Sequence, residues 1–182
     1  MTAGVDVLAA FRGLDALNRA IYYLVGALLA VITVVVFIQV LVRFVLTHAG
    51  LNISAPWTEE LARFLLVWLV FLGAAVGCRR MQLISLDFVV KAVPGIAGRL
   101  LRYLALALCL WLFVLMVRYG TQFVTIIGRT EMSPVMQVSK AWVYWAMPVA
   151  AVLMIINTCA FALEAFLEGR DIRDAATLAD TD

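Results

Sequence analysis

The chain has 182 residues, of which 65% are hydrophobic and 14% charged, and its mean hydropathy is +1.04. A soluble domain of this length needs more polar side chains to cover its surface, so the composition excludes a water-soluble globule. The net charge is only +2 and the basic residues are dispersed, which argues against nucleic acid as a partner. The sequence therefore predicts an integral membrane protein.

Four apolar segments are long enough to cross a membrane. Two of them, 20–42 and 141–163, contain 23 residues each without a charge, more than the about 20 residues that a spanning helix needs. The other two have charge-free cores of 15 residues, 64–78 and 103–117, and must include polar neighbours to reach that length. We predict a single all-α membrane domain over 1–182, with spans at about 20–46, 56–78, 100–128 and 141–163 and an acidic cytoplasmic tail at 164–182.

The distribution of lysine and arginine predicts the orientation. The connection 78–102 holds five basic residues, whereas the connection 47–55 holds none. The positive-inside rule places the basic connection in the cytoplasm, and an even number of spans then places both termini there. The first span has no cleavage pattern at its end, so we interpret it as an uncleaved helix.

The cytoplasmic connection contains a short amphipathic pattern. Apolar residues recur at helical spacing between Leu83 and Val93, among polar residues, and Pro94 ends the pattern. This favours a short interfacial helix over 81–94 that lies in the headgroup plane, with an irregular loop as the alternative.

The densest polar group lies at the start of the second span, where Glu59, Glu60 and Arg63 follow Trp57. Their spacing allows the three charges to share one helix face and neutralise each other. Charges within a span indicate a functional site by default, such as a partner contact or an ion site. The structural alternative is a helix end held by side chains that reach the headgroups.

Two further arginines lie within or at the ends of spans. Arg43 lies at the outer end of the first span, three residues before Leu46, and is expected at a depth similar to that of Arg63. Arg118 lies in the third span, where it either reaches the outer headgroups along a tilted helix or pairs with an acid of another subunit.

Several enzyme classes lack the residues that they need. The single histidine, His48, cannot provide bis-histidine haem ligation, and the three cysteines are spread over different spans without a C-x-x-C pair. No helical metal-binding motif or phosphate-binding glycine loop occurs. We therefore expect no enzyme, no catalytic residue, no metal and no cofactor.

The segment WTEELARFLLVWLVFLG at 57–73, followed by Arg79, Arg80 and Asp87, resembles the signature of a known family. It is similar to the small, DctQ-like membrane subunit of tripartite ATP-independent periplasmic (TRAP) transporters. The segment 133–148 resembles the family's approach to its last helix, so the resemblance covers nearly the whole chain. One departure is visible, because Leu83 and Ile84 stand where the family commonly has histidine and isoleucine.

The resemblance implies a scaffold subunit in the bacterial inner membrane, for sodium-coupled uptake of an organic acid. It also implies two protein partners: a periplasmic substrate-binding protein and a large TRAP membrane subunit that moves the substrate in elevator fashion. Membrane lipid is the remaining partner, and substrate would bind elsewhere. The residues that we expect to contact partners or to have a structural role are Trp57, Glu59, Glu60, Arg63 and Trp68, then Arg79, Arg80 and Asp87, and finally Arg43 and Arg118.

Two other functions stay open. An oligomeric channel or exporter would need polar residues along a pore, and Gln39, Thr121, Gln122 and Asn157 are too scattered to line one. A membrane anchor of a redox complex would leave its cofactor mainly on its partner.

Overall fold

The computed structural model describes residues 2–46, 56–79, 96–128 and 130–167. These residues are almost entirely helical, and the only strand-like pairing among them is one β-bridge between Met132 and Ser139. In chain order the elements are α1 (Thr2–Leu41), the π-helical turn η1 (Val42–Leu46), α2 (Pro56–Arg79), α4 (Ile96–Phe123), the π-helical turn η2 (Val124–Gly128), α5 (Ala141–Tyr144) and α6 (Ala146–Leu167).

Four of the described helical segments are long and apolar enough to cross a membrane: Arg12–Val45, Pro56–Arg79, Ile96–Gly128 and Ala141–Glu164. This confirms the predicted all-α class with four long apolar helices. The predicted interfacial helix at 81–94 lies outside the described residues, as do Arg80 and Asp87.

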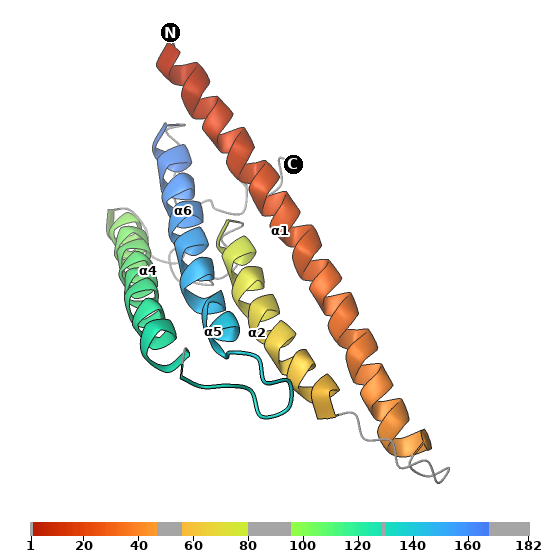
Figure 1. The fold of residues 1–182 in the computed structure, drawn as a ribbon. Coiled ribbons are helices and arrows are strands. Elements are labelled where there is room, and N and C mark those ends of the chain that lie inside the picture. Colours follow the sequence, from red (N-terminus) through yellow and green to blue (C-terminus); the bar gives the residue numbers. More distant parts are fainter. Residues whose placement is uncertain (1, 47–55, 80–95, 129, 168–182) are drawn as a thin grey trace.

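The long helices form a row rather than a closed bundle. Helix α2 packs between α1 and α6, and α6 packs between α2 and α4, so α1 and α4 form the two edges of the row (Figure 1). Helix α2 carries Glu60 near its start and Arg79 as its last residue. We name the two ends of the row the Glu60 end and the Arg79 end.

Helix α1 is much longer than a membrane span. Its 40 residues correspond to about 60 Å at 1.5 Å per residue, twice the about 30 Å of a hydrocarbon core. It begins at Thr2, ahead of the span predicted to start near residue 20. Figure 1 shows its N-terminal end extending past the other helices.

Two small clusters of buried apolar side chains join neighbouring helices. Where α2, α4 and α6 meet, the cluster contains Ala75, Cys78, Phe113, Ala150 and Met154. Where α1 meets α2, it contains Ile21, Leu72 and Val76. Many other apolar side chains are exposed along all four helices, which suits helices that face lipid or another membrane protein.

Two glycines allow α4 to approach the last span closely. A Cβ atom at Gly120 would lie 3.0 Å from Cδ of Pro148, and one at Gly128 would lie 2.9 Å from the Cα atom of Ala141. Small residues at such contacts let transmembrane helices pack through their backbones. Pro148 also explains the break between α5 and α6 at Trp145, because it has no N–H to donate to the carbonyl of Tyr144.

We predict that Gly128→Ala destabilises the protein although alanine favours helices. Its Cβ would press on the backbone of Ala141, and overpacking of this kind costs about 1–3 kcal/mol in the free energy of unfolding. Thermal unfolding of the purified protein in detergent would measure the change.

The matched control is Gly26→Ala, because a Cβ atom at Gly26 would have no neighbour within 4 Å among the described residues. This variant should be neutral or gain about 0.5–1 kcal/mol from the helix propensity of alanine. Equal melting temperatures for the two variants would contradict the close contact at Gly128.

Candidate functional site

The charged group predicted at the start of α2 is present at the Glu60 end, but its charges pair differently from the expectation. Arg63 donates to Glu59 across 3.0 Å, and the two side chains are 70% and 63% exposed. Such an exposed pair contributes less than about 1 kcal/mol to stability. Glu60 bonds elsewhere, so the direct ion pair within this group joins Glu59 and Arg63.

Glu60 holds the connection between α4 and α5. Its carboxylate accepts a hydrogen bond from the backbone N–H of Met136 at 2.8 Å. In the same turn, Ser133 donates to the Val138 carbonyl at 2.9 Å, and Gln137 donates to the Ser133 carbonyl at 3.2 Å. Gln137 has a φ of 52°, a left-handed conformation that residues other than glycine rarely adopt. The bond from Glu60 therefore fixes a strained turn over the start of α2.

Two more contacts hold this connection and the short helix α5 that follows it. The indole N–H of Trp68 donates to the carbonyl of Trp142 at 3.1 Å, which ties α2 to α5. Lys140 and Glu131 form an ion pair at 2.9 Å, and the hydrogen bond to Glu131 raises the pKa of Lys140 above its ordinary value. Lys140 thus stays a cation beside the start of the last span.

An apolar cleft of about 540 Å³ lies between the start of α2 and this connection. Phe64, Val67, Val143 and Tyr144 contribute to its wall. The charged residues that also line it are Glu59, Glu60, Arg63 and Lys140. The predicted Trp57 is exposed at the same helix start, whereas Arg43 lies in η1 with its guanidinium 5.8 Å from the centre of the Phe44 ring.

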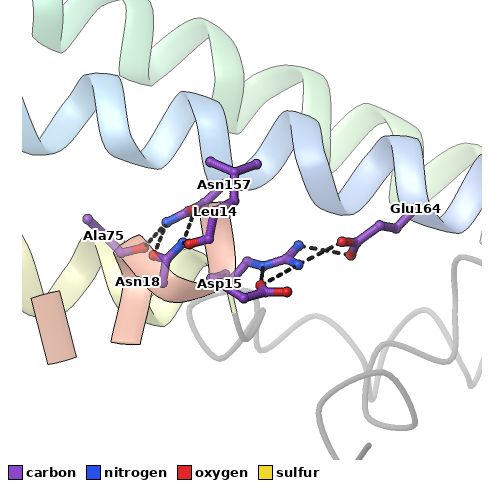
Figure 2. A network of polar contacts seen from close by, with 7 residues as sticks. Leu14, Asp15, Asn18, Ala75, Asn157 and Glu164 are labelled. Carbon is purple, nitrogen blue, oxygen red and sulfur yellow. Dashed lines mark hydrogen bonds and ion pairs between the residues drawn. The ribbon is translucent and has the colours of Figure 1, made fainter. Parts of the chain in front are cut away.

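At the Arg79 end, one guanidinium joins three helices. Arg79 ends α2, and its N–H groups bond Asp15 of α1 at 2.8 and 3.1 Å and Glu164 of α6 at 2.6 and 2.8 Å (Figure 2). Only 14% of the Arg79 side chain is exposed. Charge-assisted bonds from a planar guanidinium are directional and strong, so this arrangement fixes the relative positions of α1, α2 and α6.

A second polar contact lies beside it in Figure 2. The amides of Asn18 and Asn157 donate to each other's oxygens at 2.8 Å, and Asn157 also donates to the Ala75 carbonyl at 2.8 Å. Asn18 completes its bonding at the Leu14 carbonyl, 2.9 Å away. Both asparagines are buried. The pair therefore connects α1 to α6, and α6 to the backbone of α2.

Sequence reasoning missed most of this network. It grouped Arg79 with Arg80 and Asp87 as residues for partner contacts or a structural role, whereas the structure pairs Arg79 inside the row. Asp15 and Asn18 had no assigned role, and Asn157 was weighed only as a pore residue. Glu164 was predicted as the first residue of the acidic tail, but it lies in α6. A usable signal did exist, because an asparagine deep in an apolar span needs a partner on another helix.

The remaining predicted residue, Arg118, lies on the edge helix α4. Its side chain is exposed, and within the described residues it has no carboxylate or carbonyl partner. An arginine in the central part of a lipid-facing helix costs about 2.5–3.5 kcal/mol on insertion scales. The described residues also contain no group of three histidine, cysteine or acidic side chains that could hold a metal ion.

We predict that the Asn18–Asn157 contact is energetically coupled. Asn18→Leu and Asn157→Leu should each destabilise the protein, since each leaves a buried amide with fewer bonds. The double variant should be less destabilised than the sum, by about 0.6–1.7 kcal/mol for a hydrogen bond between membrane helices. Unfolding by SDS in mixed micelles would measure this cycle.

The control cycle combines Asn157→Leu with Thr33→Val. Thr33 is exposed and bonds only the Leu29 carbonyl of its own helix at 2.8 Å, so these two changes should add. Simple additivity in the Asn18–Asn157 cycle as well would contradict the contact.

Four long apolar helices in a row, joined by polar bonds from Asn18, Asn157 and Arg79 to neighbouring helices, define a small multi-pass membrane protein. Comparison with models of known protein families identifies one family. The family model described as the DctQ component of tripartite ATP-independent periplasmic transporters matches residues 32–168. The chain therefore belongs to the DctQ family, the small permease component of TRAP transporters.

Individual relatives agree with the family match. A Haemophilus influenzae protein described as a TRAP transporter small permease is 25% identical over 141 residues, covering 76% of this chain and 82% of that protein. The sialic acid TRAP transporter permease SiaT of another Haemophilus influenzae strain is 26% identical over 144 residues, 78% of this chain. The isethionate TRAP transporter permease DctMQ of Oleidesulfovibrio alaskensis is 35% identical over 74 residues, 40% of this chain. The matched regions are 22% of SiaT and 11% of DctMQ.

Proposed function

We propose that this chain is the scaffold subunit of a sodium-coupled TRAP transporter for organic acid uptake. Its partners would be a large elevator-type membrane subunit and a periplasmic substrate-binding protein. It would lie in the bacterial inner membrane with both termini in the cytoplasm, as the distribution of basic residues indicates. The Glu60 end then faces the periplasm.

The observation that carries this proposal is that polar side chains between the helices bond to one another. The Asn18 and Asn157 amides and the Arg79 guanidinium bond to groups on neighbouring helices, which leaves these side chains committed to holding the row together. The buried cluster where α2, α4 and α6 meet contains small and apolar residues, although Arg102 of α4 is also buried. Such a layer is suited to supporting a neighbouring protein, because solute transport needs polar groups that are available to a solute.

The longer relatives support a large membrane partner. In SiaT and DctMQ the region that matches this chain is a minor part of the protein, so most of each permease lies outside it. We infer that the remainder corresponds to the large subunit, which this chain would contact as a separate protein. Sialic acid and isethionate are both organic anions, in agreement with uptake of an organic acid.

Co-purification tests the proposal directly. The tagged chain, expressed with the large membrane subunit of its transporter and extracted in mild detergent, should retain that subunit. Substrate uptake in cells should require the chain, the large subunit and the substrate-binding protein together. Isolation only as a homo-oligomer would favour a channel, and visible absorbance from a bound cofactor would favour a redox anchor.

We predict that Glu60→Lys lowers substrate uptake by about tenfold, equivalent to about 1.4 kcal/mol, while the protein still inserts. The change removes the acceptor for the Met136 N–H, so the turn between α4 and α5 loses its attachment to α2. Uptake of radiolabelled substrate, with membrane levels measured by immunoblot, would report both effects.

Two variants separate the causes. Glu60→Gln keeps an acceptor oxygen and should retain most of the uptake. Glu59→Lys breaks only an exposed ion pair, so a loss there would indicate that surface charge at the Glu60 end contacts a partner. Normal uptake with Glu60→Lys would remove this residue from the proposed site.

A further inference from the structure

The outward face of α4 carries polar side chains in an unusual place. The positions of α4 that pack on α6 include Phe113 and Gly120. Trp111, Arg118 and Gln122 project from the opposite side at helical spacing, and all three are exposed. Thr125 continues the same stripe but uses its hydroxyl on the backbone of its own helix, at the Thr121 and Gln122 carbonyls. We call Trp111, Arg118, Gln122 and Thr125 the α4 stripe.

The depth of Arg118 follows from contacts between α4 and the last span. Gly128 touches Ala141, the first residue of that span, and Gly120 touches Pro148. Arg118 lies ten residues before Gly128, which is about 15 Å along a helix axis. Half of a hydrocarbon core is also about 15 Å. Arg118 therefore lies well inside the span, away from its Glu60 end.

Lipid is a poor environment for this stripe. Neither the Arg118 guanidinium nor the Gln122 amide bonds to any other side chain within the described residues. In contrast, the threonines nearby satisfy their hydroxyls within α4. A cation and an amide at this depth require acceptors on a neighbouring protein, because hydrocarbon offers none.

We propose that the α4 stripe is the surface on which the large membrane subunit docks, with a carboxylate or uncapped helix carbonyls of that subunit accepting from Arg118. This inference rests on the proposed function and adds the face and the chemistry of the contact. Helix α4 is an edge of the row (Figure 1), so a partner reaches this face without separating any of the four helices. Trp111 supplies a large apolar contact beside the charge, a combination common at the centre of interfaces.

Photo-crosslinking tests which face is occupied. Trp111 on α4 and Phe37 on α1 are 63% and 62% exposed, on opposite edges of the row, so they form a matched pair. Each would be replaced in turn by a photoreactive phenylalanine analogue in the chain co-expressed with the large subunit. We expect an adduct with the large subunit from position 111.

The outcomes separate this inference from the proposed function. Co-purification of the large subunit without an adduct from position 111 would overturn the docking surface and leave the scaffold function standing. An adduct between two copies of this chain at position 111 would also overturn it. Loss of co-purification in the unsubstituted protein would instead refute the scaffold function.

Arg118→Leu tests the charge itself. Leucine suits lipid better than arginine, so insertion and thermal stability of the chain alone should be unchanged or improved. We expect the recovered large subunit to fall by about tenfold or more, since removal of one partner from a desolvated charge contact weakens a complex strongly. Arg118→Lys should restore part of the recovery, because lysine keeps the charge but not the planar donor geometry.

The matched control is Arg99→Leu, an exposed arginine near the start of the same helix at the Arg79 end. This variant should keep normal recovery of the large subunit. Unchanged recovery with Arg118→Leu would show that the arginine sits in lipid without a protein partner, which overturns the proposal.

Discussion

The row of helices depends on directional polar bonds at the Arg79 end. In a membrane, apolar side chains gain little by leaving lipid for another helix, so apolar packing alone specifies neighbours weakly. The Arg79 guanidinium and the Asn18–Asn157 pair bond to specific groups on α1, α2 and α6. These bonds select one lateral and axial arrangement from the many that smooth apolar helices would permit. They also explain why α1 lies against α2 although few of its side chains are buried.

The two ends of the row are organised in different ways. At the Arg79 end, charges and amides bond between helices, and the Arg79 guanidinium and both asparagines are largely shielded. At the Glu60 end, the ion pair of Glu59 and Arg63 remains exposed, and Glu60 bonds the backbone of a turn. The first arrangement makes a rigid junction, whereas the second leaves charged groups accessible around an apolar cleft. A scaffold needs both properties, because it must keep its own shape while presenting groups to neighbours.

Much of the architecture was predictable from apolar length, because a charge-free segment of 23 residues has few alternatives to a membrane helix. The order of the helices in the row was not predictable. It depends on Pro148 meeting Gly120, and on Asn157 meeting Asn18, and neither pairing leaves a periodic pattern in one sequence. The exposed charges of 59–63 stood out because they lie close together at the start of one helix. Arg79 was visible too, but its carboxylate partners belong to distant segments, Asp15 and Glu164.

The separation of these partners along the chain affects how the protein matures during synthesis. Asn18 and Asn157 are 139 positions apart, and Glu164 is made 85 positions after Arg79. The first helix can therefore pack on α2 and pair Asp15 with Arg79 early, whereas Asn18 and Arg79 reach Asn157 and Glu164 only after the last helix has been made. A truncated product that lacks the last helix would keep the Asp15–Arg79 pair but leave the Asn18 amide without Asn157 and the Arg79 guanidinium without Glu164, and these two unsatisfied groups would distinguish it from the finished chain.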